Sequence, residues 1–156
     1  MVTDEIREYN KQLIAKYPWL LPYNRFTGEV PNDYDYTYTE LDDMPDGWRK
    51  AFGEQMCEEI QQALNMMEPD VANTFHIMQI KEKYGSLRFY TNWLTDQIRK
   101  IIYRYEKLSE HTCISCGAPA TKVSLGWIDP WCDECASKMS GQFKPLNLEK
   151  DILDNL

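Results

Sequence analysis

Two cysteine motifs near the C-terminal end, Cys113-Ile114-Ser115-Cys116-Gly117 and Cys132-Asp133-Glu134-Cys135, stand out in this sequence of 156 residues. Fifteen residues separate them, and they use four of the five cysteines. Each Cys-x-x-Cys pair can place two thiolates on one tight turn, so the two pairs can complete a tetrahedral Zn²⁺ site. Gly117 suits such a knuckle because the turn often needs a positive φ there. The predicted metal ligands are Cys113, Cys116, Cys132 and Cys135.

Four thiolates fill the coordination shell of zinc and leave no position for water or substrate, which is typical of structural zinc. His111, two residues before Cys113, is an alternative ligand. A pair of disulfides is the alternative to a metal, and it needs an oxidising compartment. The segment Met1–Glu8 is charged and lacks the apolar core of a signal peptide, and no apolar run approaches the roughly 20 residues that cross a bilayer. We therefore expect a cytoplasmic protein with reduced thiols.

Three segments carry apolar residues at helical spacing. In residues 4–17 the predicted buried stripe is Ile6, Tyr9, Leu13 and Tyr17, with Thr3 or Asp4 as N-cap. In residues 46–68 it is Phe52, Met56, Ile60, Ala63 and Met67, with Asp46 as N-cap and Pro69 ending the helix. In residues 95–109 it is Ile98, Ile101, Ile102, Tyr105 and Leu108, with Thr95 as N-cap. The fifth cysteine, Cys57, lies beside the second stripe and is predicted to be a small buried hydrophobe.

Two further segments favour extended structure. The pattern of residues 75–91 predicts a β-hairpin that turns at Gly85, because the backbone conformation of such a turn disfavours residues with a β-carbon. Tyr34, Tyr36 and Tyr38 alternate with short polar residues, which predicts a strand with a tyrosine face. We also expect Trp127 and Trp131 to pack against the rest of the domain. The last residues are weakly patterned, with a short helix predicted over residues 148–153.

The fold class predicted from these patterns is α+β, with three helices, a small antiparallel hairpin or sheet, and a C-terminal Cys₄ zinc ribbon or knuckle module. The predicted boundaries are residues 1–110 for an α+β domain, 111–140 for the zinc module packed on it, and 141–156 for a tail. A structural zinc ion would supply folding free energy that a short, loop-rich segment lacks.

The hairpin and the cysteine array carry a resemblance to a known group. The stretch from Gln79 to Tyr90, QIKEKYGSLRFY, followed by a helix and the two knuckles, resembles a group of small uncharacterised proteins common in bacteriophage and prophage genomes. In that group a Q-[IV]-K-E-K-[FY]-G-x-L-R-F-Y hairpin precedes a Cys₄ knuckle pair. The match covers residues 76–135, and the group brings no assigned activity. The resemblance implies a phage-type protein in the cytoplasm of a bacterial host.

Charge is concentrated in one acidic segment, residues 29–46. The net charge is −8, from 25 acidic and 17 basic residues, and this segment holds seven acids and no base. We expect it to bind a protein partner, in the manner of an acidic inhibitor that imitates nucleic-acid phosphates on a basic host protein, such as a defence or nucleic-acid-binding protein. An ordinary solvated loop is the alternative. The candidate partner-binding residues are Asp33, Tyr34, Asp35, Tyr36, Tyr38, Glu40, Asp42 and Asp43.

The alternative function is nucleic-acid binding by the zinc ribbon protein itself. Basic residues of the predicted hairpin and third helix could form one face that contacts phosphates. The candidates are Lys81, Lys83, Arg88, Arg99, Lys100, Arg104 and Lys107. An enzyme would need convergent titratable groups, for instance Asp33, Asp35 or Asp43 near His76, and no motif in the sequence supports a catalytic class. We therefore expect no catalytic activity.

Overall fold

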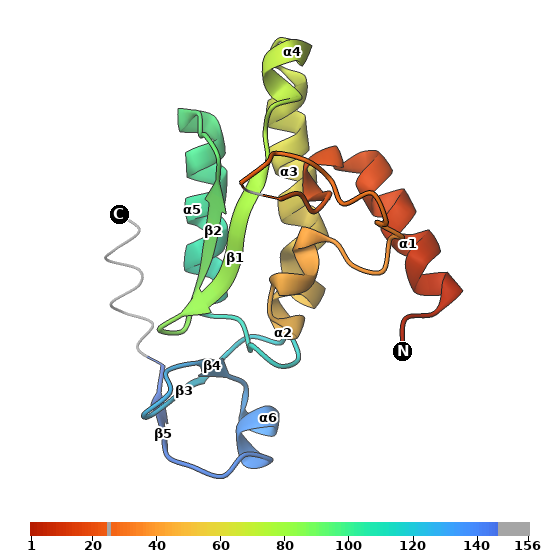
Figure 1. The fold of residues 1–156 in the computed structure, drawn as a ribbon. Coiled ribbons are helices and arrows are strands. Elements are labelled where there is room, and N and C mark those ends of the chain that lie inside the picture. Colours follow the sequence, from red (N-terminus) through yellow and green to blue (C-terminus); the bar gives the residue numbers. More distant parts are fainter. Residues whose placement is uncertain (25, 147–156) are drawn as a thin grey trace.

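The computed structural model describes residues 1–24 and 26–146 and shows an α+β protein (Figure 1). Helices α3 (Glu54–Asn65) and α5 (Asp96–Ser109) flank an antiparallel hairpin of β1 (Ile77–Lys83) and β2 (Ser86–Thr91), and helix α1 (Asp4–Lys16) lies on the far side of α3 (Figure 1). A second sheet of β3 (Lys122–Ser124), β4 (Pro130–Trp131) and β5 (Phe143–Pro145) lies at one end of the molecule with helix α6 (Asp133–Ser137). The other elements are η1 (Pro18–Leu20), η2 (Glu40–Asp43), α2 (Asp46–Trp48), η3 (Arg49–Gly53) and α4 (Pro69–Ala72).

Helix α1 begins where the sequence predicts, because the Thr3 side chain accepts a hydrogen bond from the Ile6 N–H. Its buried face is only partly as predicted. Leu13 is buried, whereas Ile6 and Tyr9 are exposed. The first turns of α1 project away from the rest of the molecule, so only the second half of the helix reaches the core (Figure 1).

The second predicted helix is a continuous helical run from Asp46 to Asn65 with a π-helical turn, η3, in its middle. The predicted stripe is buried at Phe52, Met56, Ile60 and Ala63, and Met67 packs against it from a half-buried position. Two boundary predictions are wrong. Pro45 occupies the N-cap position, so Asp46 is the first helical residue. Pro69 begins the short helix α4 instead of ending α3, as its fixed φ suits a first turn.

Most of the predictions for the hairpin and for α5 are confirmed. Lys83 pairs with Ser86, so Tyr84 and Gly85 form a two-residue turn with φ of 54° and 81°. Positive φ at both positions is typical of a type I′ turn, which matches the twist of the strands. Thr95 caps α5 through the Ile98 N–H.

The buried stripe of α5 ends one turn earlier than predicted. Ile98, Ile101, Ile102 and Tyr105 are buried, but Leu108 is 45% exposed. It lines an open groove between α3 and α5 instead of the core. The last turn of α5 still contacts the hairpin, because the Ser109 hydroxyl accepts from the Leu87 N–H at 2.9 Å, but Leu108 faces the groove.

The predicted tyrosine strand does not form. Tyr36 adopts a φ of 63°, which interrupts an extended backbone, and residues 34–38 form a loop. The three rings lie together as predicted but on a loop, with centroids 4.9 Å apart for Tyr34 and Tyr36 and 5.7 Å apart for Tyr34 and Tyr38. Asn10 of α1 fixes this loop, since its buried amide donates to the Tyr36 carbonyl at 2.8 Å.

The core lies between the hairpin and the helical run. Its largest fully buried side chains include Trp48, Phe75, Leu20, Leu41, Met44, Met56, Ile60, Ile77, Leu87 and Ile98. Cys57 is also fully buried, as predicted, and burial raises the pKa of its thiol well above the ordinary value. This cysteine therefore packs as a hydrophobe and stays protonated at neutral pH.

The C-terminal lobe, residues 112–146, contains the second sheet in the order β4-β3-β5. Strand β5 pairs with β3, so the sheet extends past the predicted boundary at residue 140. Trp131 is half-buried and packs edge-on to Phe143, with centroids 6.4 Å apart. The prediction for Trp127 is wrong, because it is 76% exposed on the loop between β3 and β4. The helix predicted over residues 148–153 lies outside the described residues.

Candidate metal centre

The four predicted ligands come together in the C-terminal lobe. The sulfur atoms of Cys113, Cys116, Cys132 and Cys135 all lie within 4.8 Å of one another. The Sγ atoms of Cys116 and Cys132 are 3.6 Å apart. Zn–S bonds of about 2.3 Å in a tetrahedron require sulfur–sulfur edges of about 3.8 Å. The cluster could therefore hold a metal ion, and its size fits Zn²⁺.

The first knuckle is a tight turn built around a glycine. The Gly117 N–H donates to the Cys113 carbonyl at 3.0 Å, and the Cys113 N–H donates to the Ala118 carbonyl at 2.7 Å. Gly117 has a φ of 85°, as the sequence predicts. The Ala118 N–H points at the Cys116 sulfur at 3.5 Å, so a backbone dipole helps to stabilise that thiolate.

The second knuckle opens helix α6. Cys132 is the N-cap residue, and its sulfur accepts a hydrogen bond from the Cys135 N–H at 3.3 Å. A side-chain hydrogen bond with Cys132, followed by burial, raises the pKa of Cys135 to about 12, so the metal-free site favours the protonated thiol. A divalent cation at the centre would reverse this preference, since metal-bound thiols are deprotonated.

The first knuckle is joined to helix α2 and thus to the core. The Gly47 N–H donates to the Ile114 carbonyl, and the Trp48 indole Nε1–H donates to the Thr112 carbonyl, both at 2.9 Å. The fit is close, because a β-carbon on Gly117 would lie 2.6 Å from the Gly47 carbonyl oxygen. The cysteine cluster therefore fixes the segment on which the core residue Trp48 depends for its hydrogen bond.

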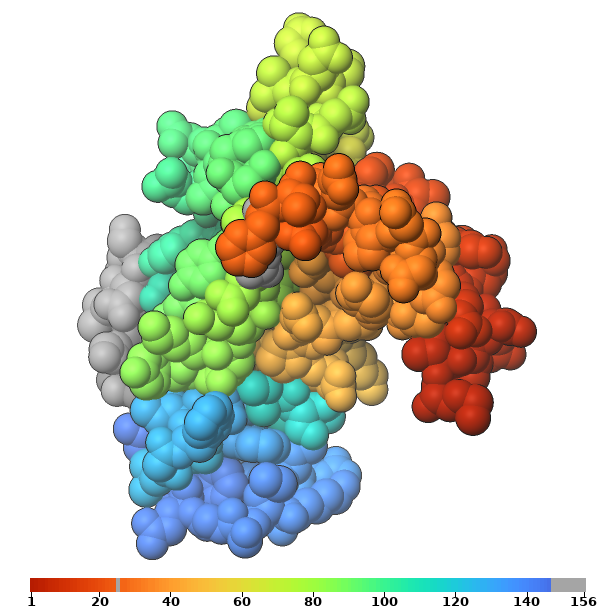
Figure 2. Space-filling view, in the orientation of Figure 1, coloured from red at the N-terminus to blue at the C-terminus, as the bar shows by residue number. Residues whose placement is uncertain are grey.

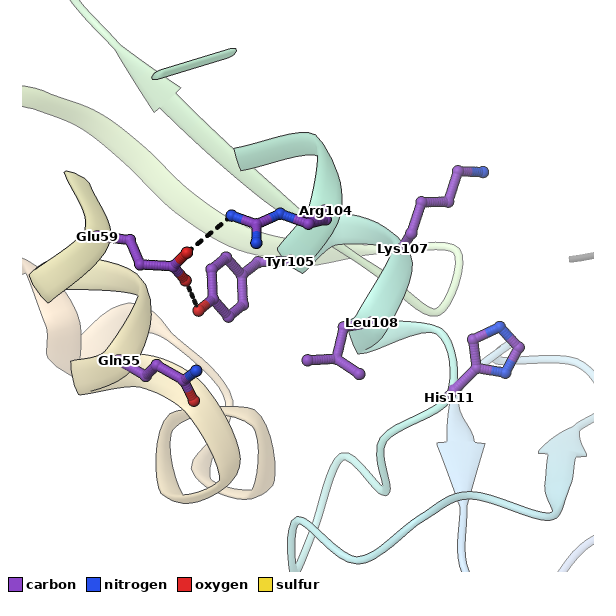
Figure 3. Close-up of a pocket in the computed structure, with 7 residues that line it drawn as sticks. All are labelled: Gln55, Glu59, Arg104, Tyr105, Lys107, Leu108 and His111. Carbon is purple, nitrogen blue, oxygen red and sulfur yellow. Dashed lines mark hydrogen bonds and ion pairs between the residues drawn. The ribbon is translucent and has the colours of Figure 1, made fainter. Parts of the chain in front are cut away.

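His111 lies outside the cluster, which contains only cysteines among the residues described. Its side chain lines the groove between α3 and α5 with Gln55, Glu59 and Leu108 (Figure 3). Its backbone continues the chain from α5 into the lobe, with the His111 N–H donating to the Leu108 carbonyl and the Ala120 N–H donating to the His111 carbonyl. His111 therefore positions the knuckle through its backbone.

The acidic segment consists of a loop followed by η2 and the first residue of α2, and its carboxylates differ in their surroundings. Asp33, Asp35 and Asp43 are exposed, and Asp35 lies 4.0 Å from the Arg7 guanidinium. Asp42 has a structural role, because its carboxylate accepts a hydrogen bond from the Thr39 N–H at 2.8 Å and forms an ion pair with Arg49. Of the other candidate partner-binding residues, Tyr38 is exposed and Tyr34, Tyr36 and Glu40 are half-buried.

The candidate basic residues lie on three elements, β1, β2 and α5, and some of them form ion pairs with acidic residues. Arg104 donates to Glu59 at 2.8 Å, and Figure 3 shows the same carboxylate accepting from the Tyr105 hydroxyl. Lys107 lies 3.9 Å from Glu110. On the hairpin, Lys81 stands opposite Arg88, while Lys83 lies 5.8 Å from the ring centroid of Tyr84. Arg99 and Lys100 are exposed on α5.

One candidate group escaped sequence reasoning. Asp129, between β3 and β4, is buried and faces Glu82 of the hairpin. Both residues look like ordinary surface acids in the sequence, and only the packing of the hairpin turn against the lobe brings them together. No local sequence pattern predicts such a pair of carboxyl groups.

Comparison with protein-family models, curated proteins and solved structures gives no significant match. In the part of the chain that the structure describes, no helix has both the length and the apolarity needed to cross a membrane. The site is therefore interpreted from its own chemistry.

Proposed function

We propose that this chain is a non-enzymatic interaction protein, held in shape by a structural Zn²⁺ ion, whose acidic segment binds a basic surface of a partner protein. The observation that carries the proposal is an acidic loop that the fold holds in place while its carboxylates at Asp33, Asp35 and Asp43 face solvent. A loop ordered before binding loses less conformational entropy when it binds, which favours affinity.

The assignment of zinc rests on the donor set. Four sulfur ligands in a tetrahedral arrangement favour Zn²⁺ over oxygen-preferring cations such as Mg²⁺ or Ca²⁺. Four thiolates also complete the coordination shell, so the ion serves structure and not catalysis. The joining of the first knuckle to Gly47 and Trp48 supports that role, because the metal then fixes the surface on which part of the core is built.

The chemistry of the partner follows from charge. A row of carboxylates can occupy the lysines and arginines that otherwise contact nucleic-acid phosphates. The acidic segment suits this role, since without it the chain has 18 acids against 17 bases and is nearly neutral. In the phage-type setting that the sequence resemblance implies, the partner would be a nucleic-acid-binding or defence protein of the bacterial host.

The test compares two triple variants with the same net charge. Asp33→Asn, Asp35→Asn and Asp43→Asn remove exposed carboxylates of the acidic segment and leave the structural Asp42 intact. Glu5→Gln, Asp70→Asn and Asp96→Asn remove exposed carboxylates elsewhere. Each protein is used to capture its partner from a bacterial lysate, and the captured partner is quantified by mass spectrometry. We expect the first variant to capture at most about one tenth of the amount that wild type and the second variant capture.

Equal capture by both variants would refute the role of the acidic segment. Nucleic-acid binding by the basic residues is the competing function, and it gives a different result. In that case the purified protein would retard DNA in a gel, and the retarded band would fade with added salt. The acidic-segment proposal expects no retardation by the protein alone, and release of DNA from the captured partner.

A further inference from the structure

A cleft lies where the turn of the β1–β2 hairpin meets the loop between β3 and β4. The two loops touch, because a β-carbon on Gly85 would lie 3.1 Å from the Ile128 carbonyl oxygen. Figure 2 shows the hairpin, in light green, resting on the blue C-terminal lobe. The pocket beside this contact has a volume of about 540 Å³, and its lining includes Tyr84, Glu110, Asp129 and Lys144. A second pocket of about 220 Å³ shares Tyr84 and Ile128 with the first, and its lining also includes Glu82, Lys83 and Trp127. We call the two pockets together the hairpin–lobe cleft.

The cleft contains a buried carboxyl group that lacks a donor. Asp129 is only 8% exposed, and its Oδ1 atom has no hydrogen-bond partner among the residues described. It faces another acid, Glu82, which can hydrogen-bond to it only when one of the two carboxyls is protonated, and whose Oε1 accepts from the Gly85 N–H at 2.8 Å. Burying an acceptor without a donor costs free energy, and a second carboxylate beside it adds repulsion. A positively charged hydrogen-bond donor would offset both of these costs.

The rim of the cleft carries two exposed aromatic rings on ordered turns. Tyr84 is 74% exposed at the hairpin turn, and Trp127 is 76% exposed on the β3–β4 loop. Ser124 closes that loop, since its hydroxyl donates to the Trp127 carbonyl and accepts from the Asp129 N–H at 2.9 Å. The indole is therefore exposed on a fixed loop. Aromatic faces attract cations, and most strongly the guanidinium group.

We propose that the hairpin–lobe cleft binds the guanidinium group of an arginine side chain from a partner protein. The planar group can stack on an aromatic rim residue while its N–H donors reach Asp129 and Glu82. This inference does not depend on the acidic segment, because it concerns a different surface and different carboxylates. The hairpin–lobe cleft would be a second binding site on the protein, and it would recognise a guanidinium group.

The pH dependence is a specific consequence. Burial, followed by the charge and hydrogen bonding of Glu82, raises the pKa of Asp129 to about 7. Below that pH a proton bridges the two carboxyls, and above it both are ionised, so protons compete with guanidinium. Other charged or titratable groups at the cleft are Lys83 and Tyr84 on the hairpin, Glu110 after α5, and Lys144 on β5. We expect binding to strengthen up to about tenfold from pH 6 to pH 8.

The test uses N-acetyl-arginine amide as the probe and neutral N-acetyl-citrulline amide as its matched control. With the ¹⁵N-labelled, metal-loaded full chain, we expect the arginine compound to shift the Trp127 indole N–H and the Gly85 and Gly126 amides in NMR spectra. Citrulline has nearly the same shape without the charge, so it should leave these signals in place. Equal shifts from both compounds, equally tight binding of N-acetyl-lysine amide, or weaker binding at pH 8 than at pH 6 would overturn the proposal.

Two variants locate the site. Asp129→Asn removes the buried charge and should abolish binding of the arginine probe, whereas Asp70→Asn, on the distant helix α4, should not change it. Trp127→Ala alters an exposed side chain, so it should keep fold and metal content while weakening binding at least about threefold. Wild-type affinity for the probe in the folded Trp127→Ala protein would refute the stacking contact.

Discussion

Replacing Cys116 by serine is expected to remove the bound metal and unfold the C-terminal lobe. Structural zinc contributes about 10–16 kcal/mol of apparent binding free energy in small zinc domains, which is comparable with the about 5–15 kcal/mol that stabilises a whole domain. Losing one of four sulfur ligands leaves the knuckles without their organising centre. We expect the free energy of unfolding to fall by roughly 5 kcal/mol or more, measured by denaturant titration with elemental analysis of the purified protein.

Cys57→Ala is the matched control for this variant, because Cys57 is the one cysteine outside the cluster. It should keep full metal content and lose only about 1 kcal/mol from the smaller side chain. A strong chelator should affect wild type and Cys57→Ala alike and leave Cys116→Ser unchanged. An unchanged melting curve for Cys116→Ser, or metal-free wild-type protein with paired cysteines, would contradict the structural role of the metal.

The features that the sequence predicts well are those coded within a few residues. The Cys-x-x-Cys pairs, the N-caps at Thr3 and Thr95, and the turn at Gly85 each depend on local backbone geometry. The stripe through Phe52, Met56, Ile60 and Ala63 is also local, because helical periodicity alone places these residues on one face. For the same reason the four clustered cysteines are the part of the candidate site that could be named from sequence.

The features that escaped prediction depend on contacts between distant segments. The tyrosines of residues 34–38 have the alternation of a strand, but within residues 1–24 and 26–146 no strand pairs with them, and Asn10 of α1 holds Tyr36 at a positive φ. Leu108 continues the helical periodicity of the α5 stripe, but it faces the open groove between α3 and α5. The Glu82–Asp129 pair exists only because the hairpin turn packs on the C-terminal lobe. None of these contacts leaves a pattern in the local sequence.

Gly47 in α2 is another such position, and its replacement by alanine is expected to be the most damaging of the small substitutions. A β-carbon there would lie 2.2 Å from the Cys113 carbonyl oxygen and 2.6 Å from the Ile114 carbonyl carbon. Both atoms belong to the backbone of the first knuckle, so no side chain can move aside. Relief requires separating α2 from the knuckle, which breaks the bonds from Gly47 and Trp48 to the lobe. We expect a loss of about 3 kcal/mol or more in the free energy of unfolding.

Gly53→Ala, in the same helical run, separates this clash from any general effect of alanine. The nearest atom to its added β-carbon is Cγ of the Arg49 side chain, at 3.2 Å, so a shift of a few tenths of an ångström relieves the contact without moving the knuckle backbone. Alanine is also favoured over glycine in a helix by about 1 kcal/mol, so this variant should match or exceed wild-type stability. If α2 and the knuckle form one cooperative unit, Gly47→Ala should also release metal to a chelator faster than Gly53→Ala does. Identical release rates and identical denaturation midpoints for the two variants would show that the metal centre and the core are independent.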